Sequence, residues 1–402
     1  MTANPDPIFS IVDRANELRA AGVNVISLAA GEPGAATAPH IVAAAENALS
    51  DIANHHYGSA SGMLALRAAI ADRLHESLHS TWDADDVLIT MGAKQALYLA
   101  LCAILEPGEG VIVAKPCWPG HRGAVAAAAG AVKYAETTLE TGFLVTPDIL
   151  EAAWDPRTKA VILASPANPT GGVYSDSQWS AIARWVRERD VWLITDDVYA
   201  ALVYDGVHTP LLASAPDMRD KCILVNSVSK AHAMTGWRVG WLAGPSEIIA
   251  AATTMLSRTI THVPQVMQAA ALEAVRGDQA ALAAARWAYR ARRDRMQAAF
   301  TAVEGVECIL PRGGMFVFPS VAALLRDNSA SLRSSSELAA WLLDEAHVAV
   351  VPGEAFQAPG HLRVNFTVDD RSLDEAANRL HTALRSLTTP IELASRLDAR
   401  AG

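Results

Sequence analysis

Short runs of apolar residues recur between residues 87 and 226, and segments with helical spacing separate them. The runs are VLIT at 87–90, VIVA at 111–114, VILA at 161–164, VWLIT at 191–195 and CILVN at 222–226. Uninterrupted apolar runs of this length are typical of strands buried on both faces of a parallel sheet. The alanine-rich segments 94–105 and 177–189 predict crossover helices, and Glu106-Pro107-Gly108 ends the first of them. This alternation predicts an α/β fold.

The pattern changes after about residue 246, where it is mostly helical as far as Arg293. Strand-like segments then follow at 311–320, 348–353 and 361–366, and they predict a second, smaller domain. The first forty-odd residues contain the helix-like segment 11–22 and little sheet of their own, so we expect an arm that packs against this smaller domain. The predicted division is 1–45 as N-terminal arm and part of the small domain, 46–285 as large domain, and 286–402 as C-terminal small domain.

Composition and charge narrow the class of protein. The 402 residues are 51% hydrophobic and 19% charged, which is typical of a globular chain of two domains. The net charge of -10 and the lack of a basic tract argue against a nucleic-acid partner. The N-terminus does not resemble a signal peptide, and no apolar run approaches the roughly 18 residues of a membrane span. We therefore expect a soluble cytoplasmic protein.

The four cysteines lie far apart without a CxxC pair, so they predict neither a metal site nor a disulfide framework. They are Cys102, Cys117, Cys222 and Cys308. The expected role is that of small buried side chains or inert thiols in a reducing compartment.

Unusual residues follow the first three apolar runs, and in open α/β sheets ligands bind at these carboxyl ends of strands. Gly92-Ala93-Lys94 opens a helix whose free N–H groups suit a phosphate, although a bare helix start has the same sequence. Trp118 and His121 follow the second run, where the indole covers a flat ring or belongs to the core. Asn168 precedes Pro169 in a turn-rich loop and offers an amide to the crevice.

Charged residues follow the last two runs. Asp196, Asp197 and Tyr199 follow one of them, and a carboxylate there requires a cation or donor unless it caps the next helix. Lys230 follows the other, and a lysine whose pKa is lowered by burial becomes a nucleophile toward an aldehyde. An acid for a pyridinium nitrogen, a stacking ring, phosphate donors and this lysine together predict pyridoxal phosphate (PLP) as cofactor.

Seven motifs resemble, in order, those of the class I/II aminotransferases, which are fold type I pyridoxal phosphate enzymes. They are GEPG (31–34), YGSASGMLALR (57–67), GAKQAL (92–97), PANPTGG (166–172), DDVY (196–199), SVSKAHAMTGWRVG (227–240) and RVNF (363–366). The resemblance covers nearly the whole chain and extends to bacterial aspartate/aromatic-type aminotransferases. It implies a large domain with a mostly parallel seven-stranded sheet flanked by helices, a smaller α+β domain, and a homodimer with shared active sites.

The resemblance also implies the catalytic residues. Lys230 forms the Schiff base with the cofactor and, once released, moves a proton between the substrate α-carbon and the cofactor. Asp196 keeps the pyridine nitrogen protonated, supported from behind by His121. Tyr199 and Asn168 hydrogen-bond the phenolic oxygen.

Further positions carry binding roles by the same resemblance. Trp118 stacks on the ring, and Arg363 binds the substrate α-carboxylate bidentately with the help of Gly31 and Asn168. Tyr57 reaches the phosphate of the neighbouring subunit. The remaining phosphate positions are Gly92, Ala93, Lys94, Ser227, Ser229 and Arg238.

Departures from the family pattern leave the substrate open between dicarboxylic, aromatic and other amino acids. Asp197 replaces a glutamate common in relatives, and His262 replaces an asparagine. Lys94 matches a lysine that reads a distal carboxylate in one bacterial group, but Asp6, Pro7 and Ile8 replace its hydroxylated companions. Arg258 is a second candidate or a solvated surface residue.

Two other functions remain as alternatives. One is a PLP-dependent lyase, cyclase or oxidase on the same fold, because the motif residues do not choose between these reactions. The other is a non-catalytic regulatory domain joined to a DNA-binding module, which the acidic charge disfavours.

Overall fold

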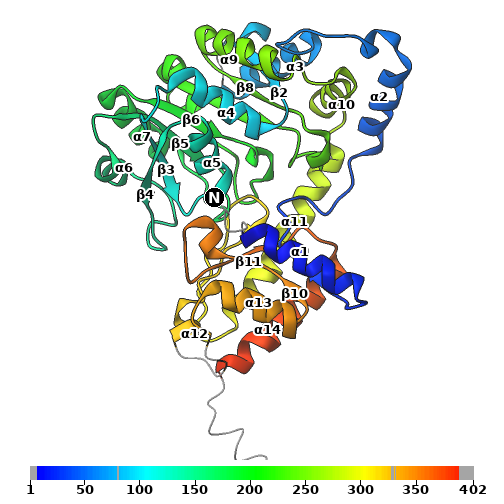
Figure 1. Cartoon of the computed structure of the whole chain (residues 1–402), viewed down its shortest axis with the longest axis vertical. Helices are drawn as coiled ribbons and strands as arrows, with labels where there is room; N and C mark the ends of the chain where they lie inside the picture. Colours follow the sequence, from blue (N-terminus) through cyan, green and yellow to red (C-terminus); the bar gives the residue numbers. More distant parts are fainter. Residues whose placement is uncertain (1–6, 79–80, 327–329, 331, 389–402) are drawn as a thin grey trace, which may run out of the picture. The chain divides into compact units, whose positions relative to one another are not determined.

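The computed structural model describes residues 7–78, 81–326, 330 and 332–388. The chain divides into two compact units (Figure 1). The large unit comprises Ala35–Trp287 and Arg312–Gly314, and the small unit comprises the described parts of Met1–Gly34, Ala288–Pro311 and Met315–Gly402.

A seven-stranded sheet forms the centre of the large unit. Its strands are β2 (Val87–Thr90), β3 (Gly110–Lys115), β4 (Ala131–Glu136), β5 (Thr158–Ala164), β6 (Trp192–Asp196), β7 (Cys222–Ser227) and β8 (Gly240–Ala243). They lie in the order β2-β8-β7-β6-β5-β3-β4, and β8 runs in the direction opposite to the other six. The predicted α/β fold with a mostly parallel seven-stranded sheet is therefore confirmed.

Two strands escaped the apolar-run pattern for identifiable reasons. β4 is an edge strand, and four of its six residues are charged or only half-buried. β8 is short, begins at Gly240 and pairs with β2 and β7, which lie far from one another in the sequence.

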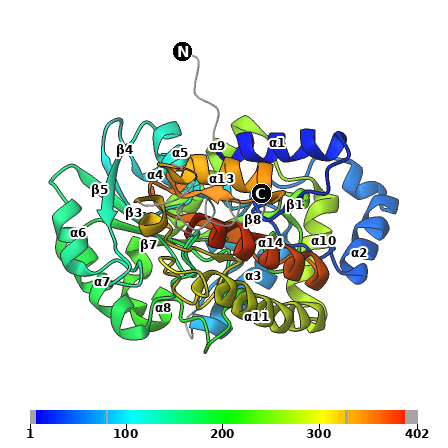
Figure 2. The same ribbon diagram turned by 90° about the horizontal axis from the view of Figure 1, so that it is seen from below.

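Helices cover both faces of the sheet (Figure 2). One face carries α4 (Ala93–Ile104), α5 (Pro119–Ala127) and α9 (Ser246–Thr259), and its core includes Ile194 of β6. The other carries α3 (Leu64–Leu78), α7 (Asp176–Arg189), α8 (Leu211–Ser214) and α10 (Gln265–Arg276), and its core includes Leu193. Successive β6 residues thus point into opposite helix layers, as the period of two in a strand requires.

The large unit has further elements outside these layers. Helix α2 (Pro39–Ser50) packs on α10, and α6 (Pro147–Ala153) packs near β4. The short 3-10 turns of the large unit are η1 (Ile52–His55), η2 (Ala84–Asp86), η3 (Ala200–Leu202), η4 (Pro216–Lys221) and η5 (Thr235–Trp237).

The small unit is a mixed α+β assembly. Its strands are β1 (Ile26–Ser27), β9 (Phe316–Val317), β10 (Val348–Ala349), β11 (Val351–Pro352) and β12 (Leu362–Asn365). β1 pairs in parallel with β10, so the N-terminal segment joins this unit, while β11, β12 and β9 form an antiparallel sheet. Its helices are α1 (Pro7–Ala20), α12 (Ala322–Arg326), α13 (Ser335–Glu345) and α14 (Asp370–Thr388), with the 3-10 turn η6 (Gly353–Phe356).

The division into units follows contacts between residues, and its ends differ from the predicted domain boundaries. The second boundary falls inside α11 (Ala280–Thr301), and α2 belongs to the large unit although residues up to 45 were predicted with the arm. The boundaries after residues 45 and 285 stay a prediction about folding domains.

Two features are absent from the described residues. None of the helices there is both long and apolar enough to cross a membrane. No group of three or more His, Cys, Asp or Glu side chains in that part of the chain is arranged to hold a metal ion.

Candidate active site

The carboxyl ends of adjacent strands in the large unit bring most of the predicted site residues to one edge of the sheet. Asp196 is the last residue of β6, and its neighbours across the sheet are Ala164 on β5 and Val225 on β7. Asn168 follows β5 by four residues, and Lys230 follows β7 by three. The register of the strands therefore places these segments side by side.

Asp196 is buried and held from two sides. Its side chain is about nine-tenths buried, and its Oδ2 lies 2.8 Å from Nε2 of His121. The backbone N–H of Val198 donates to Oδ1 at 3.3 Å. His121 is fixed in the first turn of α5, which Pro119 opens directly after β3. A carboxylate with a histidine behind it can hold a protonated ring nitrogen in front.

Two glycines keep the start of α4 open for an anion. Gly92 precedes α4 with a φ of +80°, and a Cβ there would lie 2.6 Å from Nη2 of Arg238. A Cβ on Gly240 would lie 2.5 Å from the backbone nitrogen of Ala93. No side chain caps α4, so its first-turn N–H groups face outward beside a guanidinium. This donor set fits a phosphate group.

The loop after β7 adds hydroxyl groups and an amine to the same edge. Ser227 and Ser229 are buried, and Oγ of Ser227 accepts the backbone N–H of Ser229 at 3.3 Å. The turn closes when the N–H of Met234 donates to the carbonyl of Ser229 at 3.0 Å. Lys230 is half-buried within this turn, next in the sheet to the strand that ends in Asp196.

Trp118 is half-buried at the start of α5, and no aromatic ring is stacked parallel to its indole among the described contacts. The indole meets His121 edge-on, with ring centroids 5.5 Å apart at 88°. Nζ of the exposed Lys94 lies 5.4 Å from the indole centroid. Tyr199 is buried and Asn168 is half-buried.

Arg363 and Gly31 meet inside the small unit. Arg363 is buried in β12, donates from Nη2 to the carbonyl of Ala29 at 2.8 Å, and lies over the ring of Phe316 at 4.2 Å. A Cβ on Gly31 would lie 3.9 Å from both terminal nitrogens of Arg363. Asn365 anchors the same segment by donating to the carbonyls of Ala30 and Glu32. Asn365 had appeared in the sequence only as part of the RVNF motif.

Tyr57 and Arg258, which were also singled out from the sequence, lie on the surface. Tyr57 is 87% exposed, and its ring meets that of His262 edge-on at 5.9 Å. Arg258 is exposed near the end of α9. Asp6 lies outside the described residues, and Pro7 and Ile8 begin α1.

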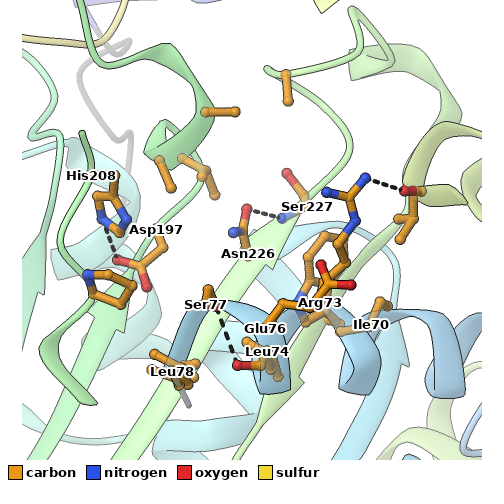
Figure 3. Close-up of a pocket in the computed structure, with 18 of the residues that line it drawn as sticks. Ile70, Arg73, Leu74, Glu76, Ser77, Leu78, Asp197, His208, Asn226 and Ser227 are labelled. Atoms are coloured by element: carbon orange, nitrogen blue, oxygen red, sulfur yellow. Dashed lines mark hydrogen bonds and ion pairs between the residues drawn. The ribbon is translucent and has the colours of Figure 1, made fainter. Parts of the chain in front are cut away.

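Sequence reasoning missed a buried pair behind Asp196. Asp197 is buried, and its Oδ1 lies 3.7 Å from Nε2 of His208 (Figure 3). Burial and the charge of Asp196 raise the pKa of Asp197 to about 7, and burial lowers the pKa of His208 to about 4. Both residues line a cavity of about 660 Å³. Asp197 was visible only as a substitution for glutamate, and His208 had no local signal.

The family described as aminotransferase class I and II matches residues 23–380. The chain belongs to this family. The resemblance inferred from the seven motifs is thereby confirmed, and the protein is an aminotransferase.

Individual relatives agree with this assignment. An aspartate aminotransferase of Streptomyces avermitilis is 42% identical over 92% of each chain. A solved structure of aspartate aminotransferase from Thermus thermophilus with maleate has a TM-score of 0.88 and 35% identity, covering 94% of this chain and 97% of that one. The aspartate aminotransferase from Rhizobium meliloti has a TM-score of 0.91 and 33% identity, covering 96% and 98%.

Proposed function

We propose that the protein is a pyridoxal phosphate-dependent aminotransferase that moves the amino group of an L-amino acid to a 2-oxo acid by a ping-pong mechanism. The donor set at the strand ends of the large unit carries this proposal: the open N-terminus of α4 beside Arg238, the buried Asp196–His121 pair, and Lys230 after β7. When bound, pyridoxal phosphate supplies an aldehyde that carries the amino group and a ring that withdraws electrons from the α-carbon.

Different residues of the large unit would bind different parts of the cofactor. The N–H groups of Gly92 and Ala93, the hydroxyls of Ser227 and Ser229, and Arg238 bind the phosphate. Asp196 would accept a hydrogen bond from the protonated ring nitrogen, and His121 holds that carboxylate in place. Tyr199 and Asn168 would bind the phenolic oxygen of the cofactor, and Trp118 would cover the face of its ring. Lys94 lies beside the Trp118 indole.

Lys230 acts as both attachment point and proton carrier. Its amine would attach to the aldehyde carbon of the cofactor, and once released its Nζ would carry a proton between the substrate α-carbon and the cofactor. Arg363 binds the substrate α-carboxylate through its planar fork, with the backbone of Gly31 close by. A lysine at position 363 lacks this bidentate geometry.

The proposed substrate class is a dicarboxylic amino acid of the size of aspartate. Relatives bear the name aspartate aminotransferase, and one solved relative is described with maleate, a four-carbon dicarboxylate. Lys94 supplies an exposed cation on α4 for the distal carboxylate. Dicarboxylic 2-oxo acids are the matching acceptors.

A homodimer is the proposed assembly, with Tyr57 of each subunit completing the partner's phosphate site. Between residues 49 and 64 the described chain exposes Leu49, Ile52, Tyr57 and Leu64 by 57%, 72%, 87% and 64%. Such a run of exposed apolar side chains marks an interaction surface. Sedimentation velocity should give twice the 42.6 kDa chain mass. A monomer in the presence of cofactor would contradict this assembly.

The four cysteines are free, which suits the proposed cytoplasmic location.

An absorbance titration tests the function directly. Purified protein loaded with cofactor is mixed with one amino acid at a time, without any 2-oxo acid. Conversion of the visible band to the near-ultraviolet band of pyridoxamine phosphate shows half of a transamination, and aspartate should respond most strongly. Release of ammonia with the visible band restored would instead indicate lyase chemistry.

A further inference from the structure

Two consecutive carboxylates are buried at the end of β6, and they face opposite sides of the sheet. Asp196 points toward α5, where it meets His121. Asp197 points into the cavity on the other face, where it meets His208 (Figure 3). The two carboxyl groups are adjacent in sequence and both are buried, so ionising both is costly, and one of them is expected to carry a proton.

The partners of the two carboxylates decide which one is neutral. Asp196 has a ring nitrogen at 2.8 Å and a backbone N–H at 3.3 Å, both able to stabilise its charge. Asp197 accepts only the hydroxyl of Thr195 at 3.3 Å within the described part of the chain, and no lysine or arginine forms an ion pair with it there. The proton therefore belongs on Asp197.

His208 supplies the nearest imidazole acceptor for that proton, at a separation longer than a hydrogen bond. Its Nε2 is buried without a hydrogen-bond partner among the described residues and lies 3.7 Å from Oδ1 of Asp197. Burial lowers the pKa of His208 to about 4. A neutral imidazole of this kind presents a lone pair to a protonated carboxyl group.

The other titratable groups around Asp197 leave this balance in place. On its own side of the sheet they are the thiol of Cys222 on β7, His232 after β7, and Arg73 and Glu76 on α3. Burial raises the pKa of Cys222 and lowers that of His232 to about 4, so both are neutral near pH 7. Arg73 and Glu76 are exposed and of opposite charge. The cavity gives Asp197 a route for proton exchange with solvent.

We propose that Asp197 and His208 form a neutral, proton-sharing pair that positions Asp196 as the single negative charge at the end of β6. Both are positioning residues that act through Asp196. The consequence for the cofactor rests on the proposed function, because it requires Asp196 to hold the ring nitrogen. The protonation of the pair itself does not.

Infrared difference spectroscopy of the full chain tests the pair without reference to the cofactor. The spectrum of wild type minus Asp197→Asn should show the C=O stretch of a protonated carboxyl at pH 6 and lose it at pH 9. In His208→Leu this band should move to higher frequency, because the carboxyl has lost its acceptor. Asp190→Asn, which changes an exposed aspartate, should leave the band as in wild type.

Two outcomes of that measurement overturn the pair. One is a wild-type spectrum in which Asp197→Asn removes no carboxyl band at pH 6. The other is an unchanged band frequency in His208→Leu. If Asp197→Asn does not fold, the comparison of wild type with His208→Leu still decides whether the pair exists.

A pH titration of the visible spectrum tests the link to Asp196 in protein loaded with pyridoxal phosphate. Wild type should show an inflection near neutral pH that Asp197→Asn lacks, because a second negative charge appears beside Asp196 only in wild type. Identical curves for the two proteins overturn the positioning role. If wild type takes up no cofactor, the proposed function fails, while the infrared spectra still decide the pair.

Discussion

Two neighbouring aspartates at the end of β6 are buried to the same extent, but they have different surroundings on the two faces of the sheet. Asp196 is 6% exposed and has a histidine at 2.8 Å, whereas Asp197 is 7% exposed and its nearest histidine nitrogen is 3.7 Å away. The first face is closed by α5, while the second opens into a cavity. Burial alone therefore does not assign a role to a carboxylate, since the groups supplied by the packed helices and loops determine its charge.

Lys230→Ala should have the largest effect, because it removes the amine while leaving both carboxylates in place. We expect transamination to fall by about 10³-fold or more. A coupled assay of 2-oxo acid formation measures it. Lys221→Ala is the control, since Lys221 pairs with Asp190 before the amino end of β7, away from the carboxyl ends of the strands. Activity within tenfold of wild type would remove Lys230 from the mechanism.

The comparison of the two faces predicts unequal effects of Asp196→Asn and Asp197→Asn. Asp196→Asn should lower kcat/KM by about 10²–10³-fold and weaken cofactor binding, because it removes the charge opposite the ring nitrogen. Asp197→Asn should cost less than about tenfold at pH 6.5, because asparagine resembles the neutral acid. Equal losses in the two variants would mean that the two faces do not differ in function.

The histidines give a matched pair on the same two faces. His121→Phe removes the 2.8 Å contact with the charged Asp196 and should cost about 10–100-fold in kcat/KM, as expected for a hydrogen bond to a charged group. His208→Phe should lower kcat/KM by a smaller factor, since the contact of His208 with Asp197 is longer. Circular dichroism of both proteins checks that folding is retained, and a larger loss at position 208 would reverse the assignment.

The free energy of unfolding should depend on pH through Asp197. The pKa of Asp197 is about 7 in the folded chain against 3.8 as its ordinary value. A carboxyl group whose pKa is higher in the folded than in the unfolded chain contributes stability that is fully present below the unfolded pKa of 3.8. This stability is lost as the pH rises through the folded pKa of about 7. Between pH 4 and pH 8, wild type should therefore lose about 1–4 kcal/mol relative to Asp197→Asn. Urea unfolding of the two proteins at several pH values measures this difference, and parallel curves would contradict it.

The smallest effect is expected at Asp190, an exposed acid that ends α7 with a φ of 51°. Asparagine tolerates this left-handed backbone, and the ion pair with Lys221 is largely in solvent. Asp190→Asn should leave the melting temperature and its pH dependence within experimental error. A pH dependence like that of Asp197→Asn would show that the signal comes from surface charge.

Much of the fold and of the candidate site could be predicted from the chain alone. The five apolar runs became β2, β3, β5, β6 and β7, because strands buried on both faces need no polar positions. The residues that follow these runs had to be polar for a reason other than packing, which singled out Asp196 and Lys230. Gly92 belonged to the same signal, since its positive φ and its closeness to Arg238 admit no side chain.

Long-range pairing decided the rest. The position of β8 between β2 and β7, the 2.8 Å contact of His121 with Asp196, and the approach of His208 to Asp197 all join segments distant in sequence. Periodicity along the chain shows which residues are buried, and it can place Asp196 and Asp197 on opposite faces of a strand. It cannot show what each face meets, because that depends on which helix or loop the tertiary structure packs against it.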